Sequence, residues 1–288
     1  MDETCTQAPA TEIRTIAIAG RRIRAGLRRS GNGGTPLLIF NGIGANFELL
    51  APLTAALEGI DTVVFDVPGA GGSPAPVLPY RFWQIARLAN RLMSALGFRG
   101  PVDVLGVSWG GALAQQFALQ YPVRCRRLIL AATSPGVLMV PGKWPVLRKL
   151  ISPRRYGDSA FLERVGAELY GGDLRSEPEL LREHGRNLSP PRGRGYLYQL
   201  LACCGWTSLP WLPLLRQPTL VLAGADDPIV PVINARLLHS RIRRSRLHVI
   251  DDGHLFLLTR TGETADLIRR FLGPHAADDA GQADGPSQ

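Results

Sequence analysis

A serine between two glycines is the residue in this sequence best placed to do chemistry. The segment Gly106-Val-Ser-Trp-Gly110 has the spacing G-x-S-x-G, and it follows the apolar run 102–107 and precedes a helical pattern. In this strand–turn–helix context a serine acts as a nucleophile, because small flanking residues let a tight turn hold its hydroxyl above the sheet. The helix N-terminus at the turn favours developing negative charge. We therefore expect Ser108 to be the nucleophile of an acyl-transfer reaction, with a chance Gly-Ser turn as the alternative.

A serine hydroxyl needs an adjacent base to react at neutral pH. The chain has five histidines, and His254 is the one that closely follows a predicted strand, over 247–250. Sites in α/β sheets lie beyond the carboxyl ends of the strands, so we expect His254 to be the base. The other four are expected to be structural or solvent-exposed: His248 within the strand, His184 and His239 on the surfaces of helices, and His275 in the C-terminal tail.

The acid that orients the imidazole is expected after the preceding strand, over 219–224. The segment Ala225-Asp-Asp-Pro228 fits this position. We choose Asp227, because the proline after it favours an extended backbone, and Asp226 stays the alternative. Three other carboxylates are less suitable: Asp251 and Asp252 are too close to His254 in sequence and are expected to cap the loop, and Asp103 begins the nucleophile's strand at the wrong end of the sheet.

Acyl transfer also needs hydrogen-bond donors for the oxyanion, ideally two backbone N–H groups. We expect the N–H of Trp109, directly after the nucleophile, to be one of them. The turn Asn41-Gly-Ile-Gly44 follows the first predicted parallel strand and is expected to supply the N–H of Ile43. The alternative is that these glycines only build a turn. Asn41 is placed to hydrogen-bond within the loop and hold it.

Strands and helices alternate along the chain, which predicts βαβ units and a mostly parallel central sheet flanked by helices. Short continuous apolar runs are typical of strands buried on both faces. A β-hairpin is predicted over 13–29. Buried strands are predicted over 36–40, 62–66, 102–107, 127–132, 219–224 and 247–250, and helices over 47–57, 80–96, 111–121, 233–240 and 264–272.

A change of composition divides the chain. Residues 1–134 and 217–273 are expected to form the α/β core, and residues 135–216 a mainly helical lid inserted after the strand that ends near Ala132. Residues 274–288 lack large apolar groups and are expected to be disordered. Within the lid, helices are predicted over 160–170 and 177–184. The lid's aromatic residues are expected either to line an apolar acyl site or to form the lid's own core: Trp144, Tyr156, Tyr170, Tyr196, Tyr198, Trp206 and Trp211.

The composition excludes several classes of protein. The 288 residues are 45% hydrophobic and 20% charged, which is typical of a globular protein with a substantial core. No apolar run is long enough for a membrane span and no secretory signal is visible, so we expect a cytoplasmic protein. The four cysteines form no disulfide or zinc pattern, and no metal or other cofactor is expected. A net charge of +9 favours anionic surfaces, but nucleic-acid-binding motifs are absent. Nothing in the sequence indicates the oligomeric state.

Eight segments carry a resemblance that goes beyond single motifs. They are Leu38–Asn46, Phe65–Gly69, Gly106–Phe117, Met139–Lys143, Ser152–Tyr156, Gly205–Ser208, Gln217–Gly224 and Ile250–Leu257. In these segments the chain resembles the α/β-hydrolase superfamily and, more narrowly, the intracellular medium-chain-length poly(3-hydroxyalkanoate) depolymerases. The resemblance spans about residues 13–272 and includes the predicted lid.

The resemblance implies an α/β-hydrolase fold and an enzyme at the surface of intracellular polyester granules. Such an enzyme cleaves ester bonds of polymers whose 3-hydroxy acids carry longer alkyl side chains. By position, Ser108, Asp227 and His254 match the family's nucleophile, acid and base. The superfamily often has His-Gly where this chain has Asn41-Gly42, which implies a somewhat different oxyanion loop.

Two alternatives remain open. One is a carboxylesterase, a lipase or another hydrolase that acts on small acyl esters, because the lid and the pocket, and not the triad, determine specificity. The other is a non-catalytic granule-associated protein that has kept the fold. The combination of Ser108 and His254 argues against it, since binding alone requires neither.

Overall fold

The computed structural model describes residues 10–152, 158–189 and 193–273, which form an eight-stranded sheet. The strand order is β1-β2-β4-β3-β5-β6-β7-β8. β2 pairs antiparallel with β1 and β4, and all other pairs are parallel. The mostly parallel sheet predicted from the sequence is therefore confirmed. The strands are β1 (Glu12–Ile18), β2 (Arg21–Arg28), β3 (Leu37–Phe40), β4 (Thr62–Phe65), β5 (Val102–Val107), β6 (Cys125–Ala131), β7 (Thr219–Gly224) and β8 (Ser245–Ile250).

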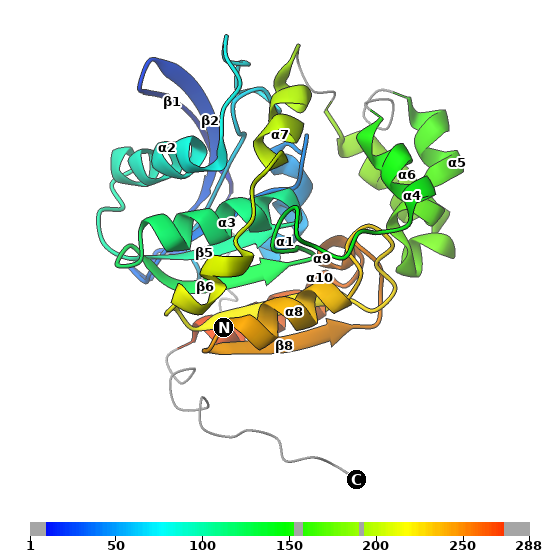
Figure 1. The fold of residues 1–288 in the computed structure, drawn as a ribbon. Helices are drawn as coiled ribbons and strands as arrows, with labels where there is room; N and C mark the ends of the chain where they lie inside the picture. The colour runs from blue at the N-terminus through cyan, green and yellow to red at the C-terminus, as the bar shows by residue number, and fades with distance from the viewer. Residues whose placement is uncertain (1–9, 153–157, 190–192, 274–288) are drawn as a thin grey trace, which may run out of the picture.

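Helices connect the strands and cover both faces of the sheet (Figure 1). The α-helices are α1 (Ala51–Ala56), α2 (Phe82–Ala95), α3 (Trp109–Gln120), α4 (Trp144–Ile151), α5 (Ser159–Tyr170), α6 (Pro178–Asn187), α7 (Gly195–Cys203), α8 (Ile233–Arg241), α9 (Phe256–Thr259) and α10 (Thr261–Leu272). Short 3-10 helices are η1 (Phe47–Leu50), η3 (Gly172–Arg175) and η4 (Leu209–Leu214).

The strand side chains alternate between two apolar clusters, as the pleat of a strand requires. On β3, for example, Leu38 and Phe40 belong to the cluster that includes residues of α2, α3 and α8. Leu37 and Ile39 belong to the cluster on the other face, with residues of α1, α9 and α10. The central strands are thus buried on both faces, which explains why they are continuous apolar runs in the sequence.

Several predicted boundaries differ from those in the structure. The helix predicted over 47–57 is η1 followed by α1, and Pro52 lies in the first turn of α1, where its missing N–H is tolerated. α3 begins at Trp109, two residues earlier than predicted, directly after the serine turn. β8 begins at Ser245 and α10 at Thr261, and the short helix α9 before it was not predicted.

The segment between β6 and β7 consists of two groups of helices. α4, α5 and α6, here called the cap helices, share an apolar cluster that includes Val146, Leu162 and Leu181. In contrast, Tyr198 of α7 and Leu212 of η4 are packed in the main core. Figure 1 shows α7 apart from the cap helices, over the centre of the molecule. The expectation of one lid over 135–216 therefore covers two structurally distinct parts.

The lid aromatics divide in the same way. Tyr170 packs among the cap helices, Tyr198 is in the main core, and Trp206 packs against Phe82 with ring centroids 5.0 Å apart. Tyr196 is buried, whereas Trp144 and Trp211 are exposed. The expectations for Tyr156, for His275 and for the tail over 274–288 lie outside the described residues. Among the described residues, none of the helices has the length and apolar character needed to cross a membrane.

Candidate active site

Ser108 lies between β5 and α3 in a backbone conformation that few non-glycine residues adopt, with φ 53° and ψ −116°. Its N–H donates to the carbonyl of Ala131 on β6 at 2.9 Å. Its own carbonyl accepts the N–H of Gly111 at 2.9 Å and the hydroxyl of Thr133 at 2.7 Å. Such strain persists only where the surroundings hold it, and it is concentrated at functional sites.

The glycines around Ser108 are required by close packing. A Cβ on Gly106 would collide with the carbonyl of Gly110, and one on Gly110 would collide with the carbonyl of Phe40 at the end of β3. α3 can therefore start close to β3 and β5 only because these positions have no side chain. The sequence spacing G-x-S-x-G thus has a direct steric reason in this fold.

His254 and Asp227 are in contact, as predicted from their positions after β8 and β7. His254 Nδ1 lies 2.7 Å from Asp227 Oδ2, and both side chains are almost completely buried. The other carboxylate oxygen of Asp227 accepts the N–H groups of Ile229 and Val230, each at 2.9 Å. The acid is therefore fixed by its own loop, and the imidazole uses Nδ1 for it, so Nε2 is the nitrogen left for a reacting hydroxyl.

The alternative acid, Asp226, lies in a different environment. Its side chain is half-exposed, forms an ion pair with Arg175, and accepts the N–H of Gly172 at 3.0 Å. Asp103 lies at the other end of the sheet, as expected, and pairs with Arg126. The carboxylate in contact with His254 is thus Asp227 and not Asp226.

The loop after β3 is held by side chains at several points. Asn41 accepts the N–H of Gly42 at 2.8 Å and donates to the carbonyl of Asn46 at 2.8 Å, so it holds the loop as expected. Gly44 donates its N–H to the side chain of Gln199 on α7 at 2.7 Å. Ile43 lies between these fixed points, and Trp109, the other expected donor, is the first residue of α3, where no acceptor exists within the helix.

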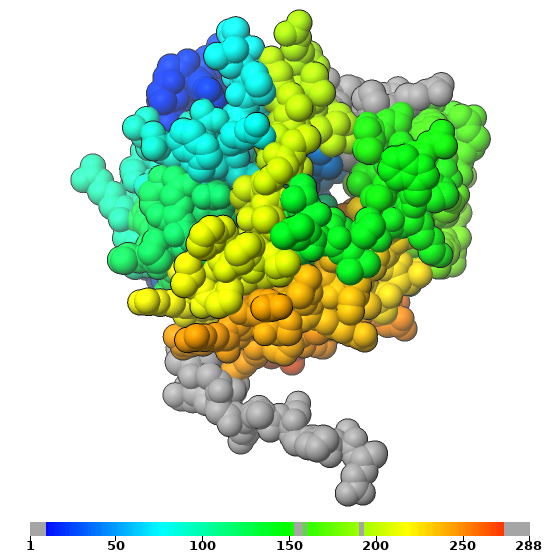
Figure 2. Space-filling view, in the orientation of Figure 1, coloured from blue at the N-terminus to red at the C-terminus, as the bar shows by residue number. Residues whose placement is uncertain are grey.

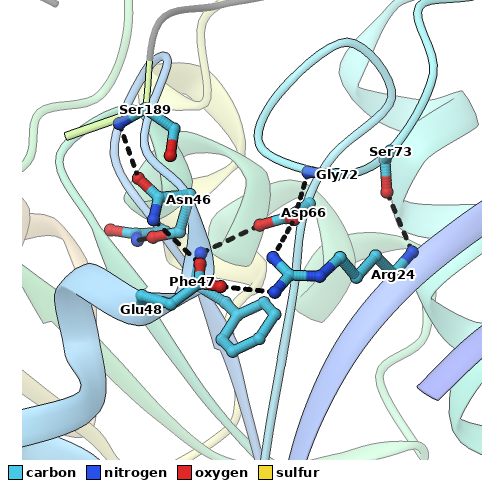
Figure 3. A network of polar contacts seen from close by, with 9 residues as sticks. Arg24, Asn46, Phe47, Glu48, Asp66, Gly72, Ser73 and Ser189 are labelled. Carbon is cyan, nitrogen blue, oxygen red and sulfur yellow. Dashed lines mark hydrogen bonds and ion pairs between the residues drawn. The ribbon is translucent and has the colours of Figure 1, made fainter. Parts of the chain in front are cut away.

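A polar network anchors the far end of this loop (Figure 3). Asp66, at the end of β4, accepts the N–H of Phe47 at 2.8 Å and pairs with Arg24 at 3.3 Å. Arg24 also pairs with Glu48 at 2.5 Å, and Asn46 bonds to Glu48 at 2.8 Å. Burial raises the pKa of the Asp66 carboxyl, and these donors oppose that effect. The network ties the loop to the sheet.

A cavity brings Ser108, His254 and Ile43 together. Its volume is about 730 Å³ when the part open to solvent is included, which is in the size range of small-molecule sites. Figure 2 shows the surface hollowed between the green cap helices and the yellow-green α7. Apart from the polar groups at its base, the cavity is lined mainly by aliphatic side chains: Leu49, Leu50, Val107, Leu150, Leu188, Leu255, Leu257 and Leu258.

His184 is a cavity residue that the sequence analysis assigned to the protein surface, and this prediction was wrong. It is 7% exposed, lines the cavity, and packs edge-on against Tyr170, with ring centroids 5.5 Å apart. Leu181 and His184 are spaced i and i+3, so they lie on the same side of α6, and Leu188 directly follows the helix. This spacing was the available signal, but a single histidine in a charged segment does not reveal which face is covered.

A turn of the cap helices contacts both loops that carry the expected acid and base. This turn, Tyr170–Asp173, is here called the cap turn. The N–H of His254 donates to the carbonyl of Tyr170 at 2.7 Å. The buried Asp252 accepts the N–H of Asp173 at 2.8 Å and also binds Thr259. The expectation that Asp252 caps its loop therefore captures only part of its role, because it also binds the cap turn.

Comparisons with known proteins agree with this architecture. The family described as alpha/beta hydrolase fold matches residues 35–261. The chain belongs to the α/β-hydrolase family. This α/β hydrolase is 51% identical over 261 residues to a poly(3-hydroxyalkanoate) depolymerase of Ectopseudomonas oleovorans. The aligned residues cover 90% of the chain and 92% of that protein. The resemblance found in the sequence is confirmed.

More distant relatives of this α/β hydrolase have other names. A 3-oxoadipate enol-lactonase of Acinetobacter baylyi is 27% identical, covering 78% of the chain and 84% of that protein. The crystal structure of an enol-lactonase from Burkholderia xenovorans superposes with a TM-score of 0.78 at 22% identity, covering 90% of the chain and 99% of that structure. At this identity the structural likeness establishes the fold only. Among the described residues, no group of three or more His, Cys, Asp or Glu side chains is placed to hold a metal ion.

Proposed function

We propose that this α/β hydrolase is an intracellular depolymerase that cleaves ester bonds of medium-chain-length polyhydroxyalkanoates. The observation that carries the proposal is the cavity, in which Ser108 and the Asp227-bound His254 lie beneath mainly aliphatic walls. Walls of this kind suit a 3-hydroxyacyl group with a long alkyl side chain, because its burial is favourable and requires no polar partner. The relative that is 51% identical, named a poly(3-hydroxyalkanoate) depolymerase, supports the same substrate class.

In the proposed mechanism, the Ser108 hydroxyl attacks the ester carbonyl carbon while His254 Nε2 takes its proton. Asp227 stabilises the imidazolium, and the N–H groups of Ile43 and Trp109 bind the oxyanion. The ester C–O bond then breaks, His254 gives its proton to the departing hydroxyl, and an acyl-enzyme remains. His254 next removes a proton from water, which attacks the carbonyl carbon of the acyl-enzyme. The bond between that carbon and Ser108 Oγ then breaks, His254 returns the proton to Ser108, and the acid is released.

From the cavity and the 51% identical relative we also propose a role for the cap helices and a cellular location for the enzyme. The cap helices over the cavity act as a lid that admits the polymer, and the enzyme works in the cytoplasm at the surface of polyester granules. The aliphatic lining contributed by Leu150 and Leu188 supports a role of this part of the chain in substrate selection. The reaction as proposed requires no cofactor.

The test is release of 3-hydroxy acids from medium-chain-length polyester granules by wild type and by Ser108→Ala. A soluble p-nitrophenyl acyl ester is assayed beside them. We expect release by the wild type, and a loss of turnover of at least about 1,000-fold in Ser108→Ala, because the nucleophile is gone while the fold remains.

The other outcomes separate the alternatives. Cleavage of the soluble ester without release from granules would favour a small-ester hydrolase. Absence of both, together with no labelling of Ser108 by a covalent serine probe, would favour a non-catalytic granule-associated protein.

A further inference from the structure

One residue of α7 contacts both loops that are expected to supply the oxyanion donors. The side-chain carbonyl of Gln199 accepts the N–H of Gly44 at 2.7 Å. The main-chain carbonyl of Gln199 accepts the indole N–H of Trp109 at 2.9 Å. Gly44 directly follows Ile43, so Gln199 is bonded to one expected donor residue and to the neighbour of the other.

Gln199 achieves this at an energetic cost. It is completely buried, and within the described part of the chain its amide nitrogen has no hydrogen-bond acceptor. A buried donor without an acceptor is unfavourable by about 1–3 kcal/mol and is uncommon in native proteins. An apolar side chain of similar size would avoid this unpaired donor. A glutamine at this position is therefore expected to provide something that an apolar residue cannot.

The chemistry of the site supplies such a reason. An apolar residue would leave the buried N–H of Gly44 without its acceptor. A glutamate would provide an acceptor, but its negative charge would lie close to the position where the oxyanion forms and would oppose it. A glutamine provides the acceptor without the charge. Its amide group also carries the nitrogen that is left unpaired.

We propose that Gln199 is a positioning residue for the oxyanion site of this enzyme. By holding the peptide next to Ile43 at a fixed place relative to Trp109, it sets the geometry of the two donors before substrate binds. The inference rests on the proposed ester hydrolysis at Ser108 and adds a residue to it. Gln199 does not contact the reacting atoms itself. It acts through the loop that it binds, because its uncharged side-chain carbonyl accepts the N–H of Gly44.

Two variants test the two halves of this inference on a soluble p-nitrophenyl acyl ester. Gln199→Met keeps the size of the side chain and removes the acceptor, so we expect kcat to fall about 10- to 100-fold at every pH, with KM within about twofold.

Gln199→Glu keeps the acceptor and adds a charge that depends on pH. Burial raises the pKa of such a carboxyl, so the side chain is neutral at low pH and ionised at high pH. We therefore expect its kcat, relative to wild type at the same pH, to fall at least about tenfold between pH 6 and pH 9.

The matched control is Gln217, another buried glutamine. Its amide nitrogen donates to the carbonyl of Pro122 at 3.2 Å, its carbonyl oxygen is buried without a donor among the described residues, and it lies at the opposite end of β7 from the site. Gln217→Met and Gln217→Glu are expected to alter thermal stability but to leave the pH profile of kcat unchanged.

A second readout separates positioning from general structural damage. An alkylboronic acid forms a charged tetrahedral adduct that resembles the transition state, whereas the product acid does not. We expect Gln199→Met to weaken boronate binding in parallel with kcat and to leave product binding within about twofold. The inference is overturned if kcat in both Gln199 variants stays within twofold of wild type, or if the Gln199→Glu ratio is flat with pH. Absence of ester turnover by the wild-type protein would instead refute the proposed function.

Discussion

At the scale of single residues, two adjacent carboxylates have opposite environments. The side chain of Asp227 is buried against His254 and fixed by two backbone N–H groups. The side chain of Asp226 is 48% exposed and binds Arg175 and the cap turn. Since a carboxylate that orients a base must contact it, we propose Asp227 as the acid and a structural role for Asp226.

This assignment predicts different results for two matched substitutions. Asp227→Asn is expected to lower kcat about 10,000-fold, because the imidazole loses the charge and the tautomer that its partner imposes. Asp226→Asn is expected to lower kcat less than about tenfold, since a half-exposed ion pair contributes little. Steady-state kinetics on the soluble ester measure both values. Equal losses in the two variants would contradict the assignment.

At the scale of secondary-structure elements, the cap turn joins the cap helices to the expected acid and base loops. Gly171 and Gly172 have φ values of +68° and +56°, in the left-handed region. A Cβ on Gly172 would also collide with the carboxylate of Asp252 and the backbone of Gly253. The turn can therefore lie against the base loop only because it is formed by glycines.

A side chain at Gly172 would have two effects: a collision with the base loop and strain from the left-handed backbone. Comparison with a second left-handed glycine separates them. Gly172→Ala is expected to destabilise the protein and to lower kcat, because the new methyl group pushes the cap turn away from Asp252. Gly193 is the matched control, with φ +58° and open space within 4 Å of the point that a Cβ would occupy. Gly193→Ala is expected to cost only the left-handed strain, about 1–2 kcal/mol, with kcat unchanged. Thermal unfolding and ester kinetics compare them, and equal effects on kcat would refute a positioning role for the cap turn.

Sequence patterns predicted the central elements well and the cap less completely. The buried strands are continuous apolar runs, so β3, β5 and β7 were predicted close to their limits in the structure. Ser108 and His254 each follow a strand, and the structure brings both to one cavity, while their catalytic roles stay a prediction. α7 was not predicted, because it is apolar on most sides and lacks a clear 3.6-residue pattern. Gln199 could not be predicted either, since its partner Gly44 lies 155 residues away in the sequence.

At the scale of the whole molecule, the net charge of +9 bears on the proposed attachment to polyester granules. A basic protein is attracted to an anionic granule coat, and added salt screens that attraction, with a Debye length of about 8 Å at 0.15 M ionic strength. We expect binding to native granules to weaken severalfold between 0.05 M and 0.5 M salt. Sedimentation of granules with bound enzyme measures this, with turnover of the soluble ester as the control. Binding that does not change with salt would show that attachment is not electrostatic.

The division of the segment between β6 and β7 has a consequence for protein engineering. α7 is packed in the main core and binds the loops around Ser108, whereas the cap helices pack in a second apolar cluster, which also includes Ile229 from the loop after β7. A chimaera could therefore exchange α4 and α6 for helices from another hydrolase and so alter the range of accepted acyl chains. We expect that it would have to retain α7 and the two glycines of the cap turn, because these contact the loops that carry the proposed catalytic groups. We therefore expect α4 and α6 to influence mainly which acyl chains are accepted, and α7 to influence mainly the positions of the loops around Ser108.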